Sequence, residues 1–340
     1  MAELVDKDPT AAERKADHLE LAFQSQTPFT DDRFDYEPLM AAHPGDSPAE
    51  RSFLNKNFRA PIWVSSMTGG TGRAGKINRN LARACGEFGM GMGLGSCRSL
   101  LTDNSRLEDF DVRNEMGEDA PLYANLGIAQ IDESIASGEV DRILAMLSIL
   151  RVDGLIIHVN PLQEWFQPEG DKIQRPPIEI IENFIEYFDG SLIVKEVGQG
   201  MGPRSLEALF RLPIDAVEFA AHGGTNFSQL EMLRGTEGDR DTFKGISSIG
   251  HSAVQMVKLA NQTLERLGDQ AKCRQIIASG GVKNFLDGYY LLSQLNCSAV
   301  YGQGSAFLRA AEDSYEAVKR QLTDQIRGYA LAEAYLQPRS

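Results

Sequence analysis

Eight short apolar runs, each followed by a segment with helical periodicity, constrain the fold of this 340-residue chain more than any other feature. In the intervening segments, such as VDRILAMLSIL and PIEIIENFIEYF, apolar residues recur at spacings of three and four. Apolar strands that alternate with helices indicate a parallel sheet, and eight such units predict a closed (β/α)8 TIM barrel. The predicted strands cover residues 61–69, 89–96, 121–127, 154–160, 191–198, 216–224, 275–281 and 298–305.

An open doubly wound sheet is the alternative, but no GxGxxG pattern opens the first helix, and the glycine-rich GMGMGLGS run lies at the second strand. Two segments fall outside the repeat. Residues 1–58 are polar and irregular apart from a helical stretch at 11–23, which predicts an N-terminal extension ahead of a barrel domain at 59–340. Residues 225–250 are long and polar, and we interpret them as a functional loop (a lid or a subunit contact) or as a disordered insertion.

Charge and composition exclude several function classes. The net charge of −14 argues against nucleic acid or an anionic membrane as the partner, although a small anionic ligand needs only a local cluster of donors. The chain has no apolar stretch of the roughly 20 residues that a membrane span requires. Its N-terminus lacks an apolar signal core, and its four cysteines are scattered, so we expect a cytoplasmic protein with reduced thiols.

Polar residues end every predicted strand. The carboxyl ends of barrel strands carry the active site, so these residues predict a ligand site. Glycines after the last two strands would let backbone N–H groups approach an anion, which indicates a bound phosphate. The residues concerned are Ser65 to Gly70, Gly95 to Arg98, Asn125, His158, Asn160, Gln163, Glu164, Lys195, Glu196, His222 to Thr225, Ser279 to Lys283 and Gly302 to Gly304.

Two charged residues at this rim have more than one interpretation. Lys195, at the end of the fifth strand, could stabilise negative charge on a bound ring or carbonyl, form a Schiff base, or simply pair with Glu196 or Glu164. Glu164 stands beside an amide, a combination that suits Mg²⁺, which takes one or two carboxylates and keeps waters or substrate phosphates. A single loop glutamate is also typical of a solvated surface charge.

Motifs along nearly the whole chain resemble those of the type 2 isopentenyl-diphosphate isomerases. In chain order they are RKADHLELA (14–22), SSMTGGT (65–71), GSCR (95–98), ANLG (124–127), HVNPLQE (158–164), VKEVGQGMG (194–202), GGTNF (223–227) and ASGGV (278–282). The resemblance implies an FMN-dependent barrel enzyme that interconverts isopentenyl and dimethylallyl diphosphate. It also implies Mg²⁺, a flavin reduced by NADPH, and a homo-oligomer, either a tetramer or an octamer.

The resemblance assigns roles to particular residues. Gln163, Lys195 and His158 would be catalytic, and Glu164 would hold Mg²⁺. The substrate would contact Arg14, Lys15, His18, Ser96, Arg98, Asn160 and Gln163. FMN would contact Ser66, Met67, Thr68, Gly69, Ser96, Asn125, Lys195 and Thr225, with Gly280, Gly281, Val282, Lys283, Gly302 and Gln303 around its phosphate.

Three departures from the family pattern stand out. Cys97 replaces a usual glutamine, KGISSIGHSAVQ replaces a run of the Trp-Gly-Ile-Pro-Thr type, and His222 precedes the glycines of the sixth strand. AAHGGTNF loosely resembles FMN-dependent 2-hydroxy-acid oxidases, in which a histidine is the base, but the arginine that follows it there is absent here. A non-catalytic flavin-binding protein is a third possibility, against which Arg14, Lys15 and Glu164 argue.

Overall fold

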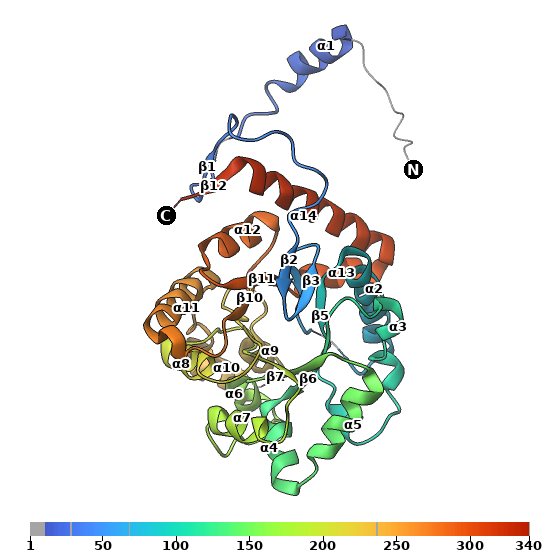
Figure 1. Ribbon diagram of the computed structural model, residues 1–340, viewed down its shortest axis with the longest axis vertical. Coiled ribbons are helices and arrows are strands. Elements are labelled where there is room, and N and C mark those ends of the chain that lie inside the picture. Colours follow the sequence, from blue (N-terminus) through green and yellow to red (C-terminus); the bar gives the residue numbers. More distant parts are fainter. Residues whose placement is uncertain (1–10, 28, 68, 236, 340) are drawn as a thin grey trace.

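The computed structural model describes residues 11–27, 29–67, 69–235 and 237–339. Eight parallel strands form a closed barrel in which β11 pairs with β4, as the sequence predicts (Figure 1). The barrel strands are β4 (Ile62–Val64), β5 (Gly91–Gly93), β6 (Leu122–Gly127), β7 (Gly154–His158), β8 (Ser191–Lys195), β9 (Ala216–Glu218), β10 (Gln275–Ser279) and β11 (Ser298–Gln303).

Helices surround the barrel and follow its strands in order. They bury amphipathic stripes against the strands, as α7 does with Ile180, Ile181 and Phe184, and several begin at a side-chain cap such as Thr71 or Ser252. The helices are α2 (Gly72–Phe88), α3 (Arg113–Met116), α4 (Ile128–Ser137), α5 (Val140–Leu150), α6 (Pro161–Phe166), α7 (Pro177–Ile185), α8 (Pro203–Phe210), α9 (Phe227–Arg234), α10 (Glu237–Ser247), α11 (Ala253–Leu267), α12 (Phe285–Gln294), α13 (Ser305–Asp313) and α14 (Tyr315–Tyr335).

The long segment after β9 is neither an irregular loop nor a disordered insertion, because it folds into α9 and α10 before α11 begins. Asn226 starts α9 by accepting a hydrogen bond from the backbone N–H of Gln229. Helix α9 packs against both α6 and α10. The polar composition that suggested a loop belongs to two surface helices, and their role as a lid or subunit contact stays a prediction.

The amino-terminal end of the barrel is closed by a hairpin of β2 (Arg51–Phe53) and β3 (Lys56–Phe58). The Leu54 N–H donates to Gln275 Oε1, and the Ser298 hydroxyl donates to the Ser52 carbonyl, so the hairpin is bonded to the first residues of β10 and β11. Its apolar side chains join one inward-facing residue from most strands in a core cluster of Phe53, Leu54, Phe58, Trp63, Tyr123, Ile156, Ile193, Ala216, Ile277 and Val300. Apolar side chains therefore fill the amino-terminal end of the barrel.

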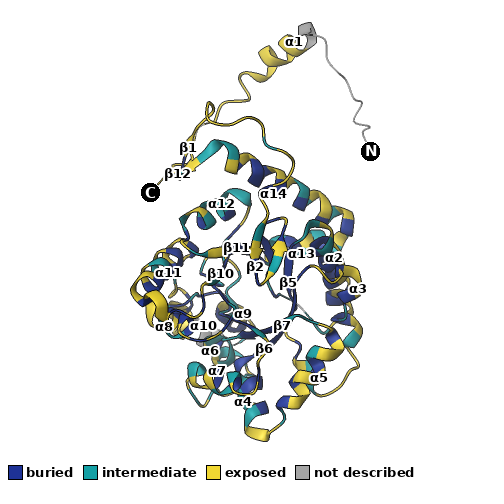
Figure 2. Ribbon diagram, in the orientation of Figure 1, coloured by how far each residue is buried: buried dark blue, intermediate teal, exposed yellow. Residues whose placement is uncertain are grey.

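The N-terminal extension is attached through a short strand. Strand β1 (Phe34–Tyr36) pairs with β12 (Leu336–Pro338) near the C-terminus, whereas α1 (Ala11–Leu21) stands apart from the barrel (Figure 1). The helix predicted at 11–23 is confirmed, and its described side chains are exposed (Figure 2). No helix within the described ranges is long and apolar enough to span a membrane.

Candidate active site at the barrel mouth

A polar layer lies directly above the apolar filling of the barrel. Side chains alternate across a strand, so a residue two positions after an inward-facing one also faces inward. Two positions beyond Trp63, Tyr123, Ile156, Ile193, Ala216 and Ile277 the chain places Ser65, Asn125, His158, Lys195, Glu218 and Ser279. The strand register pairs His158 with Lys195 and Lys195 with Glu218. The sequence thus gathers its inward polar groups in one layer at the carboxyl ends.

A cavity of about 630 Å³ opens above this layer, between the carboxyl ends of β4, β8, β9, β10 and β11. Most of the residues predicted to contact FMN line it, which brings together segments that are far apart in the sequence. They are Ser66, Met67, Lys195, Thr225, Gly280, Gly281, Val282, Lys283, Gly302 and Gln303. The lining also includes Glu218, Ser305 and Ala306, which the sequence analysis did not single out as site residues.

Three polar atoms of the cavity lining are buried and have no hydrogen-bond partner among the residues that the structure describes. They are Ser66 Oγ, Glu218 Oε2 and Gln303 Oε1. Buried polar atoms are almost always hydrogen-bonded, since an unpaired one costs about 1–3 kcal/mol. A ligand with both donors and acceptors would satisfy all three atoms. The cavity therefore suits a polar ring such as a flavin better than a purely apolar molecule.

Lys195 is buried and faces the cavity without an ion pair to any carboxylate in the described part of the chain. Its ammonium group donates to the Glu196 backbone carbonyl at 2.7 Å. The Glu196 carboxylate instead accepts the N–H groups of Gly198, Gln199 and Gly200, although its burial raises its pKa. The interpretation of Lys195 as merely the ion-pair partner of Glu196 or Glu164 is therefore wrong.

Backbone groups at one end of the cavity are arranged for an anion. Gly280 and Gly281 have φ angles of 97° and 75°, which favour glycine. Helix α13 begins beside them at Ser305, and its N-cap, Gly304, offers no capping side chain. The exposed N–H groups and the dipole of a helix N-terminus favour a phosphate. Ser305 and Ala306 could have been identified from the GQGSA run, which lies at a strand-to-helix junction.

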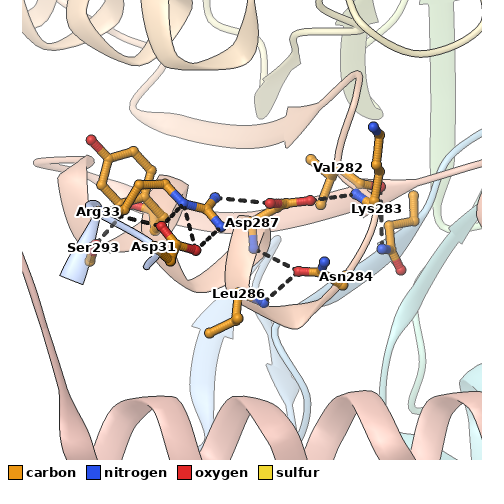
Figure 3. A network of polar contacts seen from close by, with 10 residues as sticks. Asp31, Arg33, Val282, Lys283, Asn284, Leu286, Asp287 and Ser293 are labelled. Atoms are coloured by element: carbon orange, nitrogen blue, oxygen red, sulfur yellow. Dashed lines mark hydrogen bonds and ion pairs between the residues drawn. The ribbon is translucent and has the colours of Figure 1, made fainter. Parts of the chain in front are cut away.

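Residues 280–283, here called the glycine loop, are bonded to the first turn of α12 through Asp287 (Figure 3). Asp287 Oδ2 accepts the backbone N–H of Lys283 at 2.9 Å, and the Asn284 side chain caps the N–H groups of Leu286 and Asp287. Gln303 Nε2 donates to the Val282 carbonyl at 3.3 Å. The backbone N–H of Lys283 is thus already used, so an anion in this loop would meet the N–H groups of Gly281 and Val282.

His158 and Asn125 form a second polar group on the β6–β7 side. Their side chains are joined by a hydrogen bond of 2.9 Å between His158 Nδ1 and Asn125 Oδ1. Burial, together with the nearby charge of Lys195, lowers the pKa of His158 to about 3. The imidazole is therefore neutral near pH 7. Because a carbonyl oxygen can only accept, Nδ1 carries the proton in this arrangement and Nε2 is an acceptor.

Glu164 sits in a network that joins the predicted metal and substrate residues. Asn160 Nδ2 donates to Glu164 Oε1 at 2.8 Å and to Gln163 Oε1 at 3.2 Å. The other oxygen of Glu164 accepts the N–H of Asp171, whose carboxylate pairs with Arg98 at 2.8 Å. Arg98, Asn160, Gln163 and Glu164 therefore share one region of the mouth.

The metal prediction rests on few ligands. Within the described residues, no three His, Cys, Asp or Glu side chains cluster as a metal site. Oxygens that could hold Mg²⁺ are those of Glu164 and the buried Asn160 Oδ1, which has no hydrogen-bond partner in the described part of the chain. This pair fits an ion that takes one or two protein oxygens and completes its shell with water and substrate phosphate.

The structure does not bring every predicted residue to the mouth. Arg14, Lys15 and His18 are exposed on α1, which stands apart from the barrel (Figure 1). Thr68 lies outside the described residues. Ser96 is exposed, and neither it nor Gly69 lines the cavity.

Two residues that depart from the family pattern are also placed. Cys97 is buried, and burial raises the pKa of its thiol to about 12, so it does not offer a ready thiolate. His222, the base of the oxidase interpretation, is half-buried and does not line the cavity, although its neighbours do. Its backbone forms a bridge to Ser252 at the start of α11.

Comparison with solved structures supports the fold. The chain superposes on a variant of flavocytochrome b2 with sulfite bound, with a TM-score of 0.60 at 13% identity, over 89% of this chain and 72% of that one. A mandelate oxidase variant with a monooxide FMN adduct gives a TM-score of 0.56 at 11% identity, over 91% of this chain and 88% of that one. At such identities the likeness shows the barrel fold alone.

Sequence comparison identifies the family. No protein-family model matches the chain. It is 33% identical over 308 residues to an isopentenyl-diphosphate delta-isomerase of Rickettsia felis, covering 89% of this chain and 86% of the relative. It is 32% identical over 315 residues to the isopentenyl-diphosphate delta-isomerase of Rickettsia bellii, covering 91% and 89%. The chain belongs to the isopentenyl-diphosphate delta-isomerase family.

Proposed function

We propose that this protein interconverts isopentenyl and dimethylallyl diphosphate in the barrel mouth, with FMN in the 630 Å³ cavity and Mg²⁺ at Glu164. The observation that carries the proposal is the chemistry of that cavity. It combines buried polar atoms at Ser66, Glu218 and Gln303 that have no partner among the described residues with a glycine-rich, uncapped helix start. A ring with donors and acceptors that bears a phosphate matches both features.

FMN suits this reaction because a reduced flavin can give and take a proton at an alkene and can balance positive charge. Lys195 is the buried cation of the cavity that would stabilise negative charge on the ring. NADPH would serve as the reductant of the flavin. The Gly280–Lys283 loop and the start of α13 would bind the phosphate through backbone N–H groups such as those of Gly281 and Val282.

The substrate would occupy the β6–β7 side of the mouth. His158, neutral because of its lowered pKa, and Gln163 would lie beside the reacting alkene without adding charge there. The apolar layer on the amino-terminal side of the polar residues, which includes Ile156 and Ile193, would keep water from entering through the barrel interior. Exclusion of water protects a carbocation-like species from capture as an alcohol.

The diphosphate would be held by ionic contacts at the rim. Glu164 would bind Mg²⁺, which in turn would bind the diphosphate, and Arg98 lies in the same network. Arg14, Lys15 and His18 would add contacts once α1 approaches the mouth from its separate position. Fixing the diphosphate positions the distant alkene. A homo-oligomeric state and a cytoplasmic location complete the proposal.

The test is a reconstitution assay. Purified protein loaded with FMN should convert isopentenyl diphosphate only when Mg²⁺ and a flavin reductant are both present. Oxygen consumption with lactate or glycolate, without isomerisation, would establish the 2-hydroxy-acid oxidase alternative, for which His222 is poorly placed. Failure to retain flavin would leave a protein without this chemistry.

A further inference from the structure

Arg33 joins the N-terminal extension to α12. Its Nε and Nη2 donate to the Asp31 carboxylate at 2.9 and 2.7 Å, while Nη1 donates to Asp287 Oδ1 at 2.9 Å (Figure 3). The guanidinium also lies 5.3 Å from the ring centre of Phe34 and 5.5 Å from that of Tyr290. One side chain thus forms bonds within the extension and to the helix that follows β10.

The two oxygens of Asp287 serve different segments. Oδ1 receives Arg33, and Oδ2 receives the backbone N–H of Lys283, the last residue of the glycine loop that lines the cavity (Figure 3). A carboxylate is rigid and planar, so a bond to one oxygen restricts the direction of the other. The position of Arg33 therefore restrains Lys283 through a single carboxylate.

The glycine loop has little freedom on its other side. A Cβ on Gly280 would lie 2.2 Å from backbone atoms of Ala221, and one on Gly281 would lie 3.2 Å from Gly223. The loop is thus pressed against the segment after β9 and tied on its outer side to Asp287. A small movement of Asp287 would therefore shift Lys283 and, through the backbone, the N–H groups of Gly281 and Val282.

We propose that Arg33 is a positioning residue for the cofactor-phosphate loop, so that phosphate binding and anchoring of the N-terminal extension stabilise each other. The inference rests on the proposed function, because it takes FMN as the ligand. Coupling between two sites is reciprocal. The extension, which carries Arg14, Lys15 and His18, would be held more firmly in the cofactor-loaded protein than in the empty one.

The first measurement compares the affinities of the protein for FMN and for riboflavin, which lacks the phosphate. Arg33→Met keeps an apolar stem over Tyr290 but loses the bonds to Asp287, and Arg33→Lys keeps the charge without the fork. Both should raise the Kd for FMN by about 3- to 10-fold, the usual scale of one net hydrogen bond. The Kd for riboflavin should stay unchanged.

Asp35→Asn is the matched control. Asp35 pairs with Arg339 at 2.8 Å and so fastens the same β1 segment, but it is exposed and has no bond to α12 or the glycine loop among the described contacts. Its FMN affinity should match that of the wild type. If the Arg33 variants weaken FMN and riboflavin equally, or if Asp35→Asn does the same as they do, the effect is general loosening and the inference is wrong.

The second measurement follows hydrogen exchange of the β1 amides, residues 34–36, with and without FMN. FMN should slow this exchange in the wild type and in Asp35→Asn, but not in Arg33→Met. Equal slowing in Arg33→Met would overturn the coupling. A wild type that binds neither FMN nor riboflavin would overturn the proposed function and this inference with it, whereas unaltered FMN binding in folded Arg33 variants would overturn the inference alone.

Discussion

Lys195 and Glu218 are register partners on neighbouring strands, both buried in the polar layer of the barrel, yet no ion pair joins them in the described structure. Glu218 Oε1 accepts the Ser65 hydroxyl at 2.5 Å, and Oε2 is buried with no partner among the described side chains and backbone groups. Isolated buried charges are costly unless another group satisfies them. Both side chains line the cavity, so a bound ligand would meet a lysine and a glutamate on neighbouring strands.

Glu218→Gln should make a bound flavin easier to reduce. Removing a negative charge beside the ring favours the extra charge that reduction brings, and a change of about 1.4 kcal/mol corresponds to ~30 mV for a two-electron couple. Dye-equilibrated reductive titration measures the midpoint potential. Glu231→Gln is the control, because Glu231 is also buried but pairs with Arg234 in α9, outside the cavity lining. An unchanged midpoint potential in Glu218→Gln would show that this carboxylate does not act on the flavin.

Lys195→Met should make a bound flavin harder to reduce, the opposite of the effect of Glu218→Gln, and should also slow isomerisation. Loss of the buried cation destabilises an anionic ring, so the potential should fall, and the rate should drop by about 100-fold, the effect of removing one electrostatic contact in a dry site. Lys76→Met is the control, since Lys76 lies outside the cavity lining and donates to the carbonyls of Glu312 and Asp313. Normal turnover with reduced flavin would remove Lys195 from the mechanism.

His158 should make the protein less stable as the pH falls below neutrality. Its pKa is about 3 when folded and about 6.5 when unfolded, so between these values the unfolded chain binds the extra proton. The free energy of unfolding should therefore fall with decreasing pH in this window, by about 2 kcal/mol from pH 7 to 5 through this group alone. Urea titrations of the wild type and His158→Asn isolate the contribution, and equal pH slopes would contradict it.

The barrel could be read from the sequence because its information is local and repeated. Alternation of apolar strands with helical periodicity predicts each unit, and the polar residues at the strand ends predict the mouth. The positions of Lys195 and Gly280 at the ends of predicted strands were enough to place them at a ligand site, but the role of Lys195 beside a flavin came only from the resemblance. Helices α9 and α10 were missed because α9 is short and only weakly amphipathic, and because the glycine and charged residues of RGTEGDRDTFKG are typical of a loop.

Other features depend on contacts between distant segments. Glu218 is the third residue of the predicted strand at 216–224, where nothing in the spacing marks it as a site residue, and only closure of the barrel buries it beside Lys195. Asp287 accepts one bond from the Lys283 N–H and another from Arg33, 254 positions away, and neither bond has a signature in the sequence spacing. The position of α1 likewise follows from tertiary structure, which is why Arg14 and Lys15 could be assigned a role only through resemblance.

Glu164→Gln should raise the Mg²⁺ concentration needed for half-maximal activity by about 10-fold or more. The amide keeps the size of the side chain but removes the negative charge that Mg²⁺ prefers. It also weakens the acceptor for the Asp171 N–H. Glu169→Gln is the control, because Glu169 is exposed and pairs only with Arg234 among the described ion pairs. An unchanged Mg²⁺ titration curve would eliminate Glu164 as the ligand.

Gly280→Ala should abolish retention of FMN and destabilise the protein. The residue has a φ of 97°, and an added Cβ would lie 2.2 Å from the backbone N and O of Ala221, which cannot rotate away. Backbone strain and overlap together cost about 3 kcal/mol or more. Thermal melting and flavin absorbance after gel filtration measure the two effects. Gly72→Ala is the control, because Gly72 lies at the start of α2 with no atom within 4 Å of the added Cβ. If Gly280→Ala retains FMN as the wild type does, the loop of β10 does not form the phosphate site.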